Sequence, residues 1–179
     1  MNKKLFSRRA AELSLLCGLL CSVFLSAAHF GAACDDLRSN VLRLHIIANS
    51  NSAEDQAVKL KVRDSILAQT ADIFDGKASL KEAEASAAKN IERLNEAAVK
   101  TLRENGFNYG AAAEIGNSYF ETREYEDFTL PAGNYRSLII RLGNGEGKNW
   151  WCVVFPAVCV PAAGDARLSD STAEVSADI

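Results

Sequence analysis

VLRLHIIANSNSAED, residues 41–55, places a strand, a turn and a helix start one after another. Apolar and polar side chains alternate from Val41 to Ala48, which is the pattern of a half-buried strand. The Asn-Ser-Asn run at residues 49–51 is typical of a turn. Ser52 and, three residues later, Asp55 form a capping box. The stretch therefore predicts a strand that leads through a tight turn into a helix.

Two helices are expected after this turn. The first covers about Ala53 to Gln69 and ends before the Asp-Gly pair at residues 75–76. Ser79 and Glu82 form a second capping box, which opens a helix that runs to about Glu104. Each helix carries an apolar stripe at helical spacing. The stripes are Val58, Val62 and Ile66 in the first helix and Ala83, Ala87, Ile91, Leu94, Ala98 and Leu102 in the second.

The hydrophobic period changes to two in the second half of the chain. Ala111–Phe120, Tyr135–Leu142 and Trp150–Phe155 are predicted strands, and Pro-Ala-Gly-Asn at residues 131–134 is a turn. The predicted order is therefore strand, helix, helix and three strands. This order predicts a single α+β domain over residues 40–161, with two helices packed on one face of a mostly antiparallel sheet.

Residues 1–33 have the composition of a targeting segment. Basic residues precede an apolar run from Leu13 to Ala28, and small residues follow it. The run is short for a membrane span of about 20 residues, so a signal peptide or a signal anchor is predicted. The residues before Cys34, Gly-Ala-Ala, resemble a lipoprotein cleavage site, although Gly31 stands where Leu is normally expected. A lipid-anchored binding module is therefore one alternative.

The charge of the chain argues against nucleic acid as a partner. The net charge is −3, with 24% charged and 48% hydrophobic residues, whereas nucleic-acid binding requires a basic patch. Membrane contact is expected only through the N-terminal segment. Residues 162–179 are rich in Ala, Ser and Asp, which predicts a disordered tail.

Two cysteines, Cys152 and Cys159, remain for the domain, because Cys17 and Cys21 lie in the targeting segment and Cys34 at its end. In an extended chain their Cα atoms would lie about 23 Å apart, whereas a disulfide needs about 5.5 Å. The proline between them allows a turn, so a bridge and two buried thiols are both open. No second cysteine pair accompanies them, and no metal site is expected.

The glycine loop at residues 143–149, GNGEGKN, does not have the spacing of a phosphate loop. A P-loop needs Gly, four residues and then Gly-Lys-Ser/Thr. Leu142 occupies the first glycine position and Asn149 the hydroxyl position. The loop is therefore predicted to connect two strands, and no cofactor is expected.

His45 is the one candidate catalytic base, because no other histidine follows the targeting segment. Its place on the polar face of a strand favours a partly exposed histidine or one bonded to the neighbouring turn. No catalytic residue is assigned, and the chain is not expected to be an enzyme. An extracytoplasmic cell-wall hydrolase that uses His45 or a carboxylate pair is kept as an alternative.

Trp150 and Trp151 are neighbours on a predicted strand, so their rings must point to opposite faces. One ring is expected in the core, and the other on the outer face or under a loop. Tryptophan is enriched at interface hot spots. The outward ring therefore marks a candidate partner-binding surface, unless the C-terminal region covers it.

Three segments together resemble the stage II sporulation protein R family. They are LRLHIIANSNSAEDQAVKLKVRD at 42–64, YFETREY at 119–125 and LPAGNYRSLIIRLGNGEGKNWWCVVFPAVC at 130–159. The resemblance spans about residues 40 to 160 in the same order, behind a targeting segment. The tail after residue 161 lies outside it.

This resemblance implies a signal rather than an enzyme. Members of the family are made in the forespore of endospore-forming bacteria and are exported into the space between the two septal membranes. There they activate a membrane-embedded aspartic protease, which processes the precursor of the mother-cell sigma factor, sigma E. The residues expected to contact this protease are Arg43, His45, Asn49, Ser50, Asp55, Asn149, Trp150 and Trp151.

Overall fold

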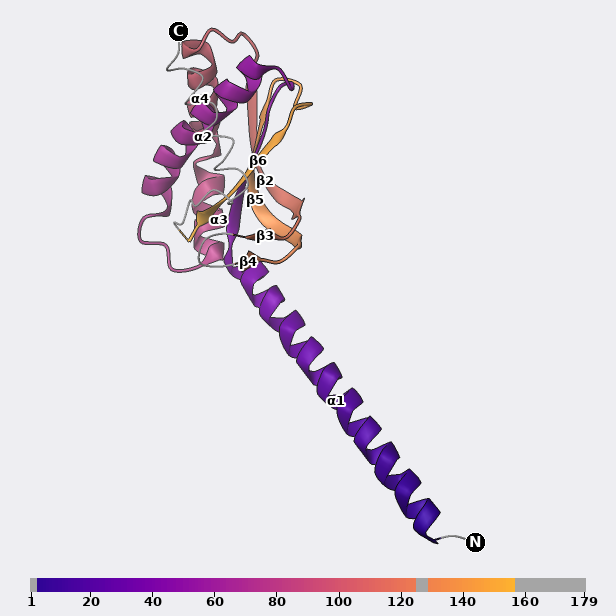
Figure 1. The fold of residues 1–179 in the computed structure, drawn as a ribbon. Coiled ribbons are helices and arrows are strands. Elements are labelled where there is room, and N and C mark those ends of the chain that lie inside the picture. Colours follow the sequence, from indigo (N-terminus) through magenta and orange to yellow (C-terminus); the bar gives the residue numbers. More distant parts are fainter. Residues whose placement is uncertain (1–2, 125–128, 157–179) are drawn as a thin grey trace, which may run out of the picture. The chain divides into compact units, whose positions relative to one another are not determined.

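The computed structural model describes residues 3–124 and 129–156 (Figure 1). The chain divides into two units, Met1–Leu37 and Arg38–Ile179. The described residues of the first unit belong to helix α1 (Lys3–Asn40). Among the described residues, the part of this helix from residue 10 onward is long and apolar enough to cross a membrane, a property that an N-terminal signal sequence shares. The predicted tail at residues 162–179 lies outside the described residues.

The strand and helix that open the domain form as predicted. Strand β1 (Leu42–Ile47) is followed by helix α2 (Ala53–Phe74). Ser52 Oγ accepts a hydrogen bond from Asp55 N at 3.1 Å, and the predicted cap of the next helix is also confirmed. Helix α2 continues past its predicted end at residue 69, because its apolar stripe extends to Ile73 and Phe74, both buried.

The second predicted helix is interrupted. Helices α3 (Leu80–Lys89) and α4 (Ile91–Glu104) occupy its range. Asn90 lies between them with φ −105° and ψ 17°, and its side-chain Nδ2 donates to Ser86 O at 2.8 Å. An asparagine side chain that bonds the backbone competes with regular helix. This competition accounts for the break, which the apolar stripe alone did not indicate.

Four strands form a mixed sheet in the order β2-β5-β1-β6. The new strands are β2 (Ala111–Phe120), β5 (Gly133–Leu142) and β6 (Asn149–Phe155). β1 is parallel to β5, and the β1–β6 and β2–β5 pairs are antiparallel. Two short strands, β3 (Arg123–Glu124) and β4 (Thr129–Leu130), form a separate ribbon. The predicted α+β class and mostly antiparallel sheet are confirmed.

The sheet has two different faces. Helices α2, α3 and α4 lie on one side, which we call the helix face (Figure 1). Strand alternation sends Leu42, Leu44 and Ile46 to the helix face, where each is fully buried in the main core against the predicted helix stripes. The opposite side, which we call the second face, carries a smaller apolar cluster. Its members are Val41, Phe120, Leu130, Tyr135 and Val153, with Trp151 packed against them.

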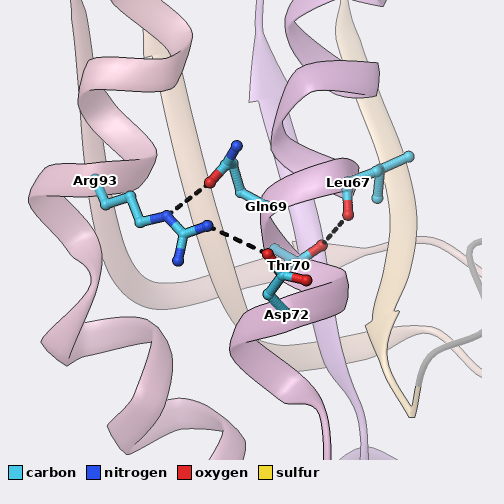
Figure 2. Close-up of polar contacts among 5 residues, drawn as sticks. All are labelled: Leu67, Gln69, Thr70, Asp72 and Arg93. Atoms are coloured by element: carbon cyan, nitrogen blue, oxygen red, sulfur yellow. Dashed lines mark hydrogen bonds and ion pairs between the residues drawn. The ribbon is translucent and has the colours of Figure 1, made fainter.

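A polar cluster ties α4 to α2 (Figure 2). Arg93 Nε donates to Gln69 Oε1 at 2.7 Å, and Arg93 Nη2 lies 3.4 Å from Asp72 Oδ2. Thr70 Oγ1 donates to Leu67 O at 3.0 Å within α2. The side chains of the ion pair are 48% and 76% exposed, so we expect it to contribute at most about 1 kcal/mol.

Candidate partner-binding site

The pairing of β1 with β6 brings together the two segments that were predicted to contact a partner. His45 lies opposite Trp151 in the strand register. Their rings are stacked, with centroids 3.8 Å apart and an interplanar angle of 25°. Asn149 Oδ1 lies 3.0 Å from His45 Nε2. Three of the predicted contact residues therefore form one cluster on the second face.

Phe120, at the end of β2, completes this cluster. Its ring makes a T-shaped contact with Trp151, with centroids 4.6 Å apart, and lies 6.3 Å from His45. In the sheet order, β5 and β1 separate β2 from β6, so the end of β2 must bend over the second face. At Gly116 of β2, a Cβ would lie only 3.0 Å from Ile139 Cδ1, so glycine lets the Ile139 side chain pack closely against the β2 backbone.

The His45 ring is held from both sides. Asn149 Oδ1 is an acceptor, so Nε2 carries the hydrogen and Nδ1 accepts from Ser118 Oγ, 3.2 Å away. Burial lowers the pKa of His45 below its ordinary value; the Asn149 bond raises it, and the charge of Arg141 lowers it. Burial and the tautomer set by its neighbours both favour the neutral form of the ring. Its partners lie on β2 and β6 rather than on the neighbouring turn.

Arg43 lies beneath the aromatic cluster. Its side chain is fully buried, and its guanidinium Cζ is 3.8 Å from the ring centroid of Phe120 and 5.2 Å from that of Tyr135. A desolvated cation–π contact is worth about 2 kcal/mol. Arg43 therefore supports the Phe120 ring from below and has no exposed surface for a partner.

Asn49, Ser50 and Asp55 hold the turn between β1 and α2. The buried Asp55 carboxylate accepts from Tyr109 OH at 2.5 Å and from Asn49 Nδ2 at 2.8 Å. Burial raises the pKa of Asp55, but its hydrogen bonds with Ser50, Tyr109 and Asn49 outweigh this effect and keep the pKa below its ordinary value. Burial and the neighbouring carboxylate raise the pKa of Tyr109, which stays a donor. These residues shape the turn.

The glycine loop at residues 143–148 packs on that turn. It connects β5 to β6, as predicted. Gly147 N donates to Ala48 O at 2.9 Å, and a Cβ on Gly147 would collide with the Ser50 carbonyl. The loop therefore needs glycine for close packing of one backbone on another.

Trp150 and Trp151 point to opposite faces of the sheet, as predicted. Trp150 is 6% exposed in the main core, and Arg63 Cζ lies 4.4 Å above its ring. Trp151 is half-buried on the second face. Of the two rings, only Trp151 offers accessible surface to a partner.

A surface pocket of about 290 Å³ adjoins Trp151. Its lining residues are Tyr119, Phe120, Glu121, Arg123, Asn149 and Trp151. The residues from the end of β2 and from β3 were not predicted as contacts. One of them, Tyr119, is 61% exposed in the structure. They form part of the YFETREY segment, but their place beside β6 depends on the bend in β2.

The structure describes Cys152 but not Cys159, the two cysteines of the possible disulfide. Cys152 is buried on the helix face, whereas Cys159 lies outside the described residues, so the disulfide stays a prediction. Cys34 lies in α1, and its acylation also stays a prediction. Within residues 3–124 and 129–156, no group of three or more His, Cys, Asp or Glu side chains is placed to hold a metal ion.

These features define an α+β domain that follows an apolar N-terminal helix and carries an aromatic pocket on the second face of its sheet. A sequence model of the stage II sporulation protein R family matches residues 38–164, and the chain belongs to this family. Membership supports a role in sporulation, and the family name denotes no enzyme.

A curated relative, stage II sporulation protein R of Bacillus subtilis (strain 168), is 34% identical over 118 residues. The match covers 66% of this chain and 53% of the relative, so the chain spans about half the length of the curated relative that it matches. No solved structure matches the chain.

Proposed function

We propose that this chain is an exported signal between two cell compartments. It activates a membrane-embedded aspartic protease, which processes the precursor of sigma E during endospore formation. The family match over residues 38–164 carries this proposal. The apolar helix Ala10–Asn40 supports the export step, because it has the length and composition of a signal anchor. Release into the septal intermembrane space and retention by this helix are both compatible with such a signal.

The second face is the part of the domain that meets the protease. Trp151 is accessible there, and His45 and Phe120 fix its ring by direct contact. A pre-positioned aromatic ring loses little conformational entropy on binding, and tryptophan is a frequent hot spot. Arg43 and Asp55 are at most 5% exposed, so their contribution is to hold the surface in shape.

Deleting the gene in its host tests the proposed function. We expect processing of the sigma E precursor to stall at the septum stage while export of other proteins continues, and the full chain should restore processing. A chain without residues 1–37, made in the forespore, is the control, because it has no export signal and should not restore processing. Normal processing in the deletion strain would overturn the proposal.

One observation favours a second candidate, an extracytoplasmic hydrolase. Ser118 Oγ, the His45 ring and Asn149 Oδ1 follow one another at 3.2 Å and 3.0 Å, in the sequence of nucleophile, base and orienting group. Ser118→Ala separates the two functions. A hydrolase loses all activity with its nucleophile, whereas a signalling surface keeps most of its activity because Asn149 still holds the ring.

A further inference from the structure

Within residues 3–124 and 129–156, β6 forms an edge of the sheet and carries few of the features that normally protect an edge strand. Among the described residues it pairs with β1 alone. Its residues Asn149–Phe155, NWWCVVF, include no charged side chain and no proline. The one irregularity in its pairing lies at the far end, between Leu42 and Arg43. Edge strands are normally blunted by charges, proline or bulges, because their open N–H and C=O groups attract another strand.

The other edge strand, β2, is less suited to pairing. Glu114 lies in its middle, with its carboxylate 4.0 Å from Arg141 Nη2. Gly116 and Asn117 follow, and both residue types weaken strands. The contrast indicates that β6 is the edge open to a partner.

The hydrogen-bond pattern shows which backbone groups of β6 point outward. Ala48 N donates to Lys148 O, in the same register that pairs His45 with Trp151. Hydrogen-bonded and non-bonded pairs alternate along antiparallel strands. The N–H and C=O groups of Asn149, Trp151 and Val153 therefore point away from β1.

The outward backbone lies beside the pocket. Asn149 and Trp151 present their backbone groups at the edge, and their side chains line the pocket. Side chains alternate along a strand, so a strand added to β6 would direct every second side chain over the second face. The lining residues include Phe120 and Trp151, whose rings are in contact, and one residue of each charge, Glu121 and Arg123. A lining of this kind suits an uncharged apolar or aromatic side chain.

We propose that the outer edge of β6 binds an extended segment of the protease as an added strand, with one apolar or aromatic side chain of that segment in the pocket beside Trp151. The identity of this partner rests on the proposed function. Main-chain hydrogen bonds to the edge supply affinity, and the pocket supplies specificity, as in other complexes formed by strand addition.

A second copy of this chain fits the edge poorly. If two β6 strands paired with each other, the side chain offered to each pocket would be Asn149, Trp151 or Val153. Trp151 is already stacked on His45 and packed against Phe120 in its own chain, and Val153 is 3% exposed. Asn149 is polar and already bonded to His45 Nε2 in its own chain. None of the three side chains is therefore suited to insertion, so the added strand comes from a different protein.

Photo-cross-linking from the full chain in its host tests the site. p-Benzoylphenylalanine replaces Tyr119, which lines the pocket and is 61% exposed. The matched control carries the same group at Lys100 on α4, whose side chain is 76% exposed. We expect light to join the protease to position 119 and not to position 100. A cross-link from position 100 alone, or none from either position, would overturn the β6 site. The deletion strain then shows independently whether the proposed function fails as well.

A disulfide ladder tests the strand addition. Asn149→Cys and Val153→Cys are each combined with single cysteines along the exposed segments of the protease, and the unsubstituted chain is the control. If a strand is added to β6, moving the cysteine by four residues along β6 moves the cross-linked position on the protease by four residues as well, whereas an unchanged position would overturn the added strand. Cross-links between two copies of the chain, or within one copy, would also overturn the proposal. Trp151→Ala should weaken binding of the protease segment about 30-fold. An unchanged yield of cross-linked protease in this variant would exclude the pocket.

Discussion

The two faces of the sheet use the same strands for different purposes. On the helix face, Leu44 and its apolar neighbours are fully buried against three helices. On the second face, the neighbouring His45 is half-buried and makes polar contacts at both ring nitrogens. Apolar burial on the helix face supplies most of the stability. The second face fixes a few polar and aromatic groups in place, which is what recognition requires.

The two tryptophans give the largest contrast between the faces. Trp150→Ala should reduce the free energy of unfolding by about 3–5 kcal/mol, because it empties a buried site in the main core. Trp151→Ala should reduce it less and leave the fold intact, while processing of the sigma E precursor is lost. Urea denaturation and a processing assay measure the two effects. Equal destabilisation by both variants would contradict the division between the faces.

The turn between β1 and α2 should respond next. Asp55→Ala leaves the Tyr109 hydroxyl and the Asn49 amide without their acceptor, so the free energy of unfolding should fall by about 1–3 kcal/mol. Tyr109→Phe is the control, because it removes one donor and keeps the carboxylate bonded to Asn49. If Tyr109→Phe reduced the free energy of unfolding as much as Asp55→Ala does, the carboxylate would not be the centre of this network.

Acidification should weaken the second face through His45. Because the pKa of His45 is lower in the folded state than its ordinary value of 6.5, the unfolded chain binds more protons between these two values. Stability is therefore fully present above pH 6.5 and declines as the pH falls towards the folded pKa. His45→Gln should remove this part of the decline in pH-dependent denaturation. An identical slope in the variant would show that His45 does not contribute.

The smallest effect is expected on the outer surface of the helices. Arg93→Ala removes the contacts with Gln69 and Asp72 (Figure 2). The ion pair is exposed, so the free energy of unfolding should change by less than about 1 kcal/mol. Processing of the sigma E precursor should stay at the wild-type level. Thermal denaturation measures the first quantity. Loss of processing in this variant would place function on the helix side.

Local patterns were sufficient for most elements of the domain. The alternation around Arg43 and the capping boxes at Ser52 and Ser79 predicted β1 and the starts of α2 and α3. The break at Asn90 was missed, because its signal is a side-chain bond within a continuous apolar stripe. Of the candidate site, His45, Asn149 and Trp151 were predicted, whereas Tyr119 and Phe120 were not.

The sequence by itself determined which residues alternate, where helices begin and that the two tryptophans face apart, because each of these depends on neighbours a few residues away. Only the tertiary structure decided that β1 lies between β5 and β6, and that β2 bends to bring Phe120 onto Trp151. Strand order and bending depend on packing between segments far apart in the chain, and local periodicity does not encode that packing. The pocket at the edge of β6 is formed by such contacts, so it appears only when the domain is folded.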